Sequence, residues 1–367
     1  MTARLDRVRS ILDERGLDAA LITHPSNRFW LTGYTGDDTP PNESAGVLLI
    51  DRATVTLLTG AVNAPWAAAE APGTEVVAWE RPWEGTVAER IKERGWRRVG
   101  FEDHATLFST HRALTEALGD RTELVALGDS VDRLRYAKEP AELAALMAAI
   151  RLTDEVFVAA TANLEAGVTE RALAWRIERE LRERGADGLA FETIVASGPH
   201  GARPHHAVSD RPIAPGEPVV IDMGARIGGY NGDLTRTVWV GEPEPRLVDV
   251  YETVARANEA AVRAIRAGVE ARAVDAAARS VIEAAGYGDD FTHGVGHGLG
   301  VRVHEGPSAS KTSEDVLRAN EVITVEPGIY IAEWGGVRIE DVVVVEETGA
   351  RVLTGAPKRV PSSTSGG

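Results

Sequence analysis

Two segments in the second half of the chain share a pattern that restricts the fold more than any other feature. Each begins with a short apolar run that ends in an acid, Asp222 in one segment and Glu326 in the other. A glycine-containing turn follows, and a second β-rich run then includes Asp233 or Glu340 near its start. Two bare carboxylates on paired strands repel each other, so one takes up a proton or a cation lies between them. The pattern predicts two β-hairpins, each with a pair of acids.

Histidines are concentrated in the same half of the chain. One of them, His297, lies between the two hairpins in the glycine-rich run 294–300, where small neighbours leave the imidazole uncrowded. Four carboxylates and one imidazole balance the charge of two divalent cations, and the oxygen-rich set favours a hard or borderline ion such as Mn²⁺. Any one of these acids alone reads better as a loop cap or a surface ion pair. The complete set favours a two-metal site, because an unpaired charge at the end of an apolar strand is costly.

The chain is longer than one hydrophobic core usually fills, since its 367 residues exceed the roughly 100–200 of a typical domain. The first third alternates short apolar runs with helical patterns, which is typical of an α/β layer domain. Residues 128–138 show little apolar periodicity, and Pro140 then fits the first turn of a long helix. We expect domains at residues 1–130 and 131–360, and a disordered tail at 361–367.

The apolar periodicity also predicts individual elements. In the first domain we expect strands at 19–23, 46–50, 55–58, 76–78 and 99–101, and helices at 2–16, 62–71, 86–95 and 108–118. In the second domain we expect helices at 139–164, 169–184, 246–267 and 271–285, and strands at 193–196, 219–223, 234–240, 322–326 and 337–345.

Composition excludes several classes of protein. The chain has no cysteine, which excludes a disulfide scaffold, a Cys-ligated metal site and a cysteine nucleophile. Its 40 basic and 56 acidic residues give a net charge of −16, which argues against nucleic-acid binding. No apolar run approaches the ~18–20 residues that span a bilayer, and residues 2–16 read as an amphipathic helix rather than a signal peptide. We therefore expect a cytoplasmic protein with no nucleic-acid or membrane partner.

Six short motifs extend the hairpin pattern. They lie at residues 222–224, 231–237, 296–300, 303–305, 324–328 and 336–341. Together they resemble the motifs of the dinuclear pita-bread metallopeptidases (family M24), and most closely those of the proline-specific members, Xaa-Pro dipeptidase (prolidase) and aminopeptidase P. Residues 16–20 and 31–36 are similar, more loosely, to the creatinase-like amino domain. The resemblance implies an α/β (α+β) chain with a creatinase-like α/β amino-terminal domain and a carboxy-terminal pita-bread catalytic domain.

The resemblance also implies a metal centre. Its five ligands would be Asp222, Asp233, His297, Glu326 and Glu340, with Asp233 and Glu340 bridging the ions. A hydroxide between the two ions would attack the peptide carbonyl. Glu326 would carry the proton from the attacking water to the leaving nitrogen, a role that suits a carboxylate within hydrogen-bond reach. We expect two divalent ions per chain, Mn²⁺ first, with Co²⁺ or Zn²⁺ as alternatives.

Four further residues match catalytic or substrate-binding positions of the family. His205 would close over the site, and His293 and His304 would contact the substrate and stabilise the tetrahedral intermediate. Arg338 would hold one of the ligand acids in place.

The other histidines receive no catalytic role. His206 adjoins His205, so strand alternation would point it away from the site, and we expect it to be structural. His200 has no assigned role. Packing or surface roles are expected for His24, His104 and His111.

An acidic, turn-rich loop at residues 34–41 adds a candidate in the amino domain. In the resembled family the partner subunit's amino domain overhangs the active site, so the family implies a homodimer. Asp37 or Asp38 of this loop would then contact the free amino group of the substrate. A solvated acidic turn is the simpler interpretation of the same residues.

The implied reaction is hydrolysis of the bond before proline in dipeptides or short peptides, a tertiary amide that lacks an N–H. We expect an Xaa-Pro dipeptidase, with aminopeptidase P acting on longer peptides as the alternative. Methionine aminopeptidase is less favoured, because the chain has an extra amino domain and because His293 and Arg338 occupy positions that look proline-specific. A metal-free creatine amidinohydrolase or a non-catalytic binding relative is less favoured still, because all five ligand positions are filled.

Overall fold

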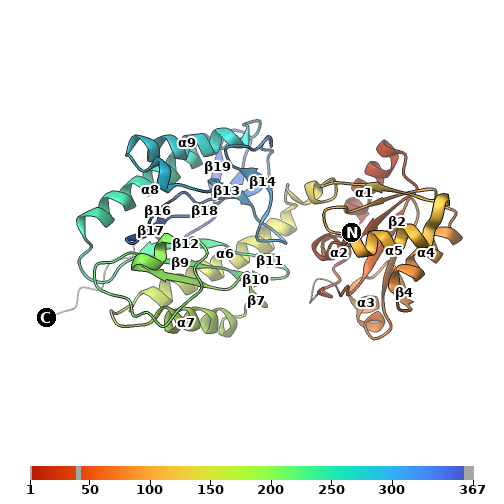
Figure 1. The fold of residues 1–367 in the computed structure, drawn as a ribbon, viewed down its shortest axis with the longest axis horizontal. Coiled ribbons are helices and arrows are strands. Elements are labelled where there is room, and N and C mark those ends of the chain that lie inside the picture. The colour runs from red at the N-terminus through yellow and green to blue at the C-terminus, as the bar shows by residue number, and fades with distance from the viewer. Residues whose placement is uncertain (1, 39–42, 359–367) are drawn as a thin grey trace. The chain divides into compact units, whose positions relative to one another are not determined.

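The computed structural model describes residues 2–38 and 43–358 (Figure 1). The chain divides into two units, Met1–Arg135 and Tyr136–Gly367, so the division lies a few residues after the expected position near residue 130. The tail at 361–367, which we expect to be disordered, lies outside the described residues. None of the helices in the described part of the chain combines the length and the apolar character needed to cross a bilayer.

A six-stranded sheet with the order β4-β3-β2-β1-β5-β6 forms the centre of the first unit. Its strands are β1 (Ala19–Ile22), β2 (Val47–Asp51), β3 (Val55–Gly60), β4 (Glu75–Trp79), β5 (Arg98–Phe101) and β6 (Glu123–Ala126). The helices of this unit are α1 (Thr2–Arg15), α2 (Pro25–Thr32), α3 (Ala64–Glu70), α4 (Trp83–Glu93) and α5 (Phe108–Leu118). The sheet is mixed, because β1 pairs antiparallel with β2 and parallel with β5.

The three histidines of the first unit serve local packing. His24 caps α2, since its Nδ1 accepts the N–H of Ser26 at 3.1 Å. His104 lies 2.8 Å from a carboxylate oxygen of the buried Asp132. The ring of His111 packs 5.0 Å from that of Phe101.

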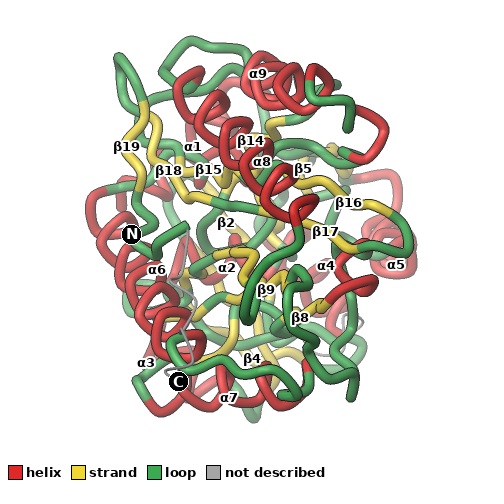
Figure 2. The backbone as a smooth tube through the Cα atoms, turned by 90° about the vertical axis from the view of Figure 1, so that its left-hand side faces the viewer, coloured by secondary structure: helices red, strands yellow, loops and turns green. Residues whose placement is uncertain are grey.

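The second unit places its strands between helices. Its helices are α6 (Pro140–Thr161), α7 (Glu170–Glu183), α8 (Pro245–Ala264) and α9 (Ala271–Ala284). Figure 1 shows α8 and α9 on one side of the strands and α7 on the other, and Figure 2 shows the same arrangement from a second direction. Side chains of α8 and α9 share one buried cluster with Ile323, Val325 and Val343. Side chains of α6 and α7 share another with Val219, Ile221 and Leu234.

Two sheets of the second unit carry the acidic residues. One has the order β12-β9-β8, formed by β8 (Ile194–Ser197), β9 (Val219–Met223) and β12 (Leu234–Val238). The other has the order β14-β13-β15-β18-β19, formed by β13 (Gly296–Gly298), β14 (Glu305–Ala309), β15 (Val322–Val325), β18 (Asp341–Val345) and β19 (Ala350–Val352). A small sheet of β7 (Gly188–Leu189), β10 (Ala225–Ile227) and β11 (Tyr230–Asn231) lies beside α6.

The strand expected at 337–345 is wrong, because the chain there forms two strands. Strand β17 (Gly335–Arg338) pairs with β16 (Gly328–Ile331), and β18 pairs with β15. At the break the backbone N–H of Glu340 bonds the carbonyl of Thr235 in β12 at 3.1 Å. Glu326 lies at the matching break between β15 and β16, where its N–H bonds the carbonyl of Val295 at 2.7 Å. Both acids therefore lie where the chain passes from one sheet to another.

Candidate metal centre

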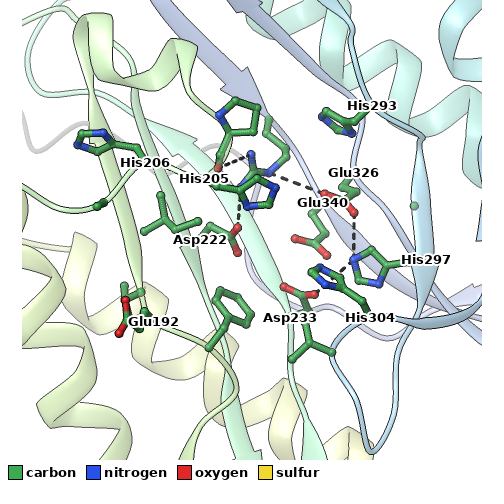
Figure 3. Close-up of a pocket in the computed structure, with 18 of the residues that line it drawn as sticks. Glu192, His205, His206, Asp222, Asp233, His293, His297, His304, Glu326 and Glu340 are labelled. Carbon is green, nitrogen blue, oxygen red and sulfur yellow. Dashed lines mark hydrogen bonds and ion pairs between the residues drawn. The ribbon is translucent and has the colours of Figure 1, made fainter. Parts of the chain in front are cut away.

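A cavity of about 1210 Å³ opens in the second unit at this junction. It is lined by all nine site residues that the sequence places in the second domain (Figure 3), namely His205, Asp222, Asp233, His293, His297, His304, Glu326, Arg338 and Glu340. The tenth, Asp37, is an exposed residue of the first unit and does not line this cavity.

Three of the acids converge inside the cavity. Asp222 comes from β9, Asp233 precedes β12, and Glu340 lies between β17 and β18. Each offers one carboxylate oxygen, and these oxygens all lie within 4.8 Å of one another. The register explains the convergence, because Asp222 pairs with Thr235, whose carbonyl also receives the N–H of Glu340.

His297 and Glu326 lie beside this group. The Nε2 of His297 is 3.1 Å from Oε1 of Glu326 and 3.8 Å from Oδ2 of Asp233. Its Nδ1 lies 3.0 Å from the carbonyl of Gly298, which can only accept, so Nδ1 bears a proton. That bond directs Nε2 toward the acids, as is usual for metal-binding histidines. Gly296 is required here, because a Cβ at this position would overlap the carbonyl of Thr324.

Burial and repulsion between neighbouring carboxylates shift the pKa values of the acids in the site. Burial, followed by the neighbouring acids, raises the pKa of Glu340 to about 8 and holds that of Asp233 well above its usual range. Burial also raises the pKa of Asp222, although Arg338 opposes the shift. Glu326 differs, because burial, which raises its pKa, is outweighed by the combined effect of its hydrogen bond to His297 and the charges of His297, His293 and Arg338, and its pKa is lowered to about 2. At His297 burial lowers the pKa, but the hydrogen bond and charge of Glu326, the bond to Gly298 and the charge of Glu340 together outweigh burial and raise that pKa to about 9.

Two carboxylate oxygens test whether metal ions fit this site. Oδ1 of Asp222 and Oε1 of Glu340 are buried and have no hydrogen-bond partner. Buried acceptors are almost always satisfied, so unpartnered oxygens among like charges indicate a cation as the missing partner. The donors are oxygens and one imidazole, which suit divalent ions of hard or borderline character. The residues present therefore fit a metal centre.

Arg338 holds one of these acids, as the resemblance implied. Its Nη2 donates to Oδ2 of Asp222 at 2.6 Å, and its Nε donates to Oγ1 of Thr235 at 2.9 Å. Its Nη1 donates to the hydroxyl of Tyr330 at 3.0 Å. The guanidinium thus fixes the carboxylate of Asp222, one of the three converging acids.

Tyr330 was not predicted from the sequence. Its hydroxyl lies 2.9 Å from Nε2 of His293, whose Nδ1 lies 2.7 Å from the carbonyl of Gly294. Because Nδ1 donates to that carbonyl, Nε2 accepts from the tyrosine, and burial lowers the pKa of His293. Strand alternation from Arg338 across the β16–β17 hairpin would have identified Tyr330, but that hairpin was not expected.

A further residue that the sequence left without a role, Arg236 of β12, holds the backbone behind the site. Its Nη1 donates to the carbonyl of Glu340, and its Nη2 donates to the carbonyl of Ala356 at 2.8 Å. Nη2 also contacts Oδ1 of Asp341 at 3.1 Å. The buried guanidinium therefore links Glu340 to the last described segment of the chain.

His304 and His205 occupy the open side of the cavity. The ring of His304 lies 4.4 Å from that of His297, edge to face, and burial lowers its pKa. His205 is exposed, whereas the adjacent His206 is buried and its Nε2 lies 3.0 Å from Oε2 of Glu170. His200 contacts the same carboxylate, with 2.9 Å between its Nδ1 and Oε1.

Known proteins resemble both units. Residues 144–347 match the description "Metallopeptidase family M24", and residues 4–137 match "Creatinase/Prolidase N-terminal domain". The chain is 35% identical to the Xaa-Pro dipeptidase of Pyrococcus furiosus over 96% of this chain and 98% of that protein.

Solved structures show the same likeness. The Xaa-Pro dipeptidase of Bacillus anthracis matches with a TM-score of 0.91 and 35% identity, over 98% of this chain and 99% of that one. The X-Pro aminopeptidase of Thermotoga maritima matches with a TM-score of 0.86 and 32% identity, over 97% of this chain and 100% of that one. The chain therefore belongs to metallopeptidase family M24 and has a creatinase/prolidase amino-terminal domain.

Proposed function

We propose that this protein is an Xaa-Pro dipeptidase that uses two divalent metal ions, Mn²⁺ in the first instance with Co²⁺ or Zn²⁺ as alternatives. The observation that carries the proposal is the convergence of Asp222, Asp233 and Glu340 in one cavity with two orphaned carboxylate oxygens. The names of the matched dipeptidases support the choice of substrate.

The positions of the five proposed ligands support a division between two ions. Asp222 lies on the Arg338 side, whereas His297 and Glu326 lie together on the other side. Asp233 belongs to the first group and is also 3.8 Å from His297, and Glu340 lies with Asp222 and Asp233, so these two acids would hold the ions together with the ligands on either side. Bound ions would polarise the peptide carbonyl and acidify a water molecule.

Glu326 is the proposed proton carrier. Its two oxygens face His297 and Arg338, at 3.1 Å and 3.9 Å, so the carboxylate stays ionised and can accept a proton near the centre. It can then release that proton to the leaving nitrogen of proline, which must be protonated because an amide anion is too strong a base to be expelled from the tetrahedral intermediate.

The histidines supply contacts for the substrate. Burial disfavours the charged form of His293, and Tyr330 and Gly294 fix the orientation of its ring. His304 and His205 approach the cavity from the more exposed side, where a peptide would enter. We propose that the three imidazoles position the peptide and stabilise the tetrahedral intermediate.

Comparison of two substrates tests the dipeptidase proposal. A dipeptidase must block residues beyond proline, so we expect kcat/KM for Ala-Pro to exceed that for Ala-Pro-Ala by about tenfold or more. Steady-state kinetics with the Mn²⁺-loaded protein measure the ratio. A ratio below one would identify an aminopeptidase P, the activity named for the Thermotoga maritima structure. Hydrolysis of neither peptide would refute both proposals.

Asp37 is proposed as a contact for the substrate's amino group within a homodimer. Asp38 contacts Arg28, 3.0 Å away, and accepts the N–H of Ala45, and its side chain is largely buried. Asp37 accepts the N–H of Asp38 at 2.9 Å and is exposed to solvent. We expect Asp37→Asn to raise KM for Ala-Pro several-fold with little change in kcat, because an exposed charge is worth up to about 1 kcal/mol. An unchanged KM, measured on protein shown by light scattering to be dimeric, would leave Asp37 as a solvated turn residue.

A further inference from the structure

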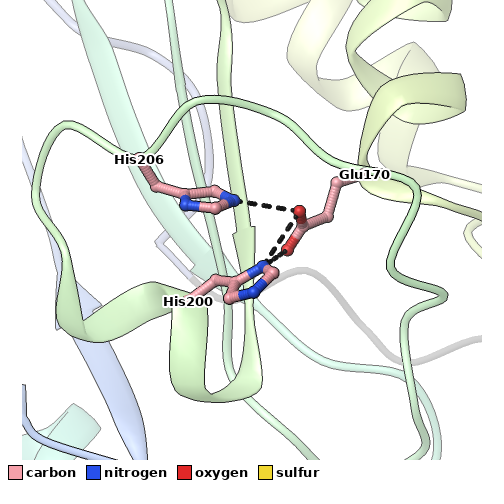
Figure 4. A group of neighbouring side chains, drawn as sticks. All are labelled: Glu170, His200 and His206. Carbon is pink, nitrogen blue, oxygen red and sulfur yellow. Dashed lines mark hydrogen bonds and ion pairs between the residues drawn. The ribbon is translucent and has the colours of Figure 1, made fainter.

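A second cluster of side chains lies on the edge of the cavity (Figure 4). Its centre is Glu170, the first residue of α7, whose side chain is completely buried. Oε1 of this carboxylate accepts the N–H and the hydroxyl of Ser197, both at 2.8 Å, and lies 2.9 Å from Nδ1 of His200. Oε2 accepts the N–H and the hydroxyl of Ser209 at 3.1 and 2.6 Å, and lies 3.0 Å from Nε2 of His206.

The side chains of the cluster lie close enough together to bind a metal ion. The hydrogen bonds of Glu170, however, leave no oxygen available as a metal ligand. Each oxygen of Glu170 already has three donors, so neither has a lone pair to spare. The guanidinium of Arg211 also donates to the hydroxyl of Ser197 at 2.7 Å, and its charge disfavours a cation nearby. These bonds lower the pKa of Glu170 to about 2 despite burial, so the carboxylate is ionised and both rings donate to it.

One carboxylate thereby fixes both ends of a loop. Ser197 ends β8, and Ser209 lies beyond His205 and His206. Two backbone bonds strengthen the attachment of the loop to α7, from the N–H of Glu170 to the carbonyl of Arg211 and from the N–H of Arg171 to that of Ser209. The described loop therefore has an anchor at each end.

His206 is the anchor closest to the cavity contact His205. Both histidines line the cavity, but the ring of His206 is buried, 8% exposed, and bonds Glu170, whereas the neighbouring His205 is exposed. Because the two residues share a peptide plane, fixing the ring of His206 restricts where the imidazole of His205 can lie.

We propose that Glu170 and His206 are positioning residues that hold His205 at the cavity. The catalytic role of His205 rests on the proposed function, whereas the attachment of the loop does not. The cost of a misplaced catalytic contact can be large, since a shift of about 1 Å can lower a rate by about 100-fold.

Two substitutions at His206 separate positioning from simple stability. The amide nitrogen of Gln reaches about as far as Nε2 of histidine, whereas that of Asn does not reach Glu170. We expect His206→Asn to lower kcat/KM for Ala-Pro about tenfold or more, and His206→Gln to restore most of the loss. Metal content and melting temperature should be the same in both variants.

A double-mutant cycle tests whether His206 acts through His205. If it does, His205→Ala combined with His206→Asn should be no slower than His205→Ala alone. Losses that multiply would overturn the proposal, because they would show that His206 acts independently of its neighbour.

Hydrogen exchange tests the anchor without reference to activity. We expect His206→Asn to speed amide exchange in residues 198–209, with residues 219–238 unchanged and His206→Gln matching the parent protein. Unchanged exchange in the Asn variant would overturn the anchor, even if the parent protein hydrolyses Xaa-Pro peptides as proposed. Conversely, the parent protein could be inactive on these peptides while the Asn variant shows faster amide exchange. That result would refute only the proposed function.

Discussion

Substitution of Glu326 by Gln is expected to lower kcat for Ala-Pro by about 1,000-fold or more. The amide keeps the shape of the side chain but can neither accept the proton nor carry it to the leaving nitrogen, and general acid–base catalysis contributes roughly 10²–10⁴-fold. It also replaces the anionic side chain of a proposed metal ligand by a neutral one. Steady-state kinetics at saturating Mn²⁺ measure the loss, and elemental analysis separates lost catalysis from lost metal.

Glu321 provides a matched control for this variant. It is also a buried glutamate next to β15, where its Oε2 accepts the N–H of Arg318 at 2.9 Å, but it does not line the cavity. Burial raises its pKa. Glutamine keeps the size of the side chain and an oxygen that can accept the same N–H. We expect Glu321→Gln to keep kcat within about twofold of the parent. Near-normal turnover in Glu326→Gln would exclude this residue as the proton carrier.

Removal of metal ions is expected to have the other large effect. Dialysis against a chelator should abolish hydrolysis, and Mn²⁺ should restore it with two ions bound per chain. Binding to the folded state alone stabilises it by about 4 kcal/mol when the free ion is 1,000 times its dissociation constant. Thermal unfolding with and without Mn²⁺ measures this gain, and equal melting temperatures at pH 8 would contradict a metal centre at these acids.

The increase in melting temperature that Mn²⁺ produces should also be larger at higher pH. The pKa of Glu340 rises from 4.5 to about 8 on folding, so its stabilising effect is present below 4.5 and lost as pH rises through 8. The raised pKa values of Asp233 and His297 act in the same direction. Glu326, with its pKa lowered to about 2, contributes unchanged stability above pH 4.5. The metal-free protein should therefore melt at a lower temperature at pH 8 than at pH 6, and Mn²⁺ should raise its melting temperature more at pH 8.

The sequence predicted elements well where local pattern decides them. Strand β9 coincides with the predicted 219–223, because its apolar run is bounded by a proline before it and a glycine after it. Helix α2 was missed because it has only eight residues and because its start depends on the side-chain cap from His24. Strand β16 was missed because Pro327 and Gly328 read as a turn, and β17 was not separated from β18 within the strand expected at 337–345.

In the candidate site, too, the sequence predicted the features that depend on local pattern and missed those that depend on distant contacts. Residue type and spacing identified the four acids and His297, all of which line the cavity. The position of Glu340 between two sheets could not be read from the sequence, because it depends on a bond to Thr235 more than 100 residues earlier. Glu170 reads locally as an ordinary acid in the first turn of a helix, since its partners follow 27–39 residues later.

The contacts of Arg236 have a consequence for the timing of synthesis. This guanidinium joins the carbonyl of Glu340 to that of Ala356, and the hydroxyl of Tyr251 bonds the carbonyl of Lys358. On the ribosome, residues 222 and 233 emerge long before these partners do. The support behind Glu340 can therefore form only after residues 356–358 have been translated, and a nascent chain that ends before residue 356 lacks it.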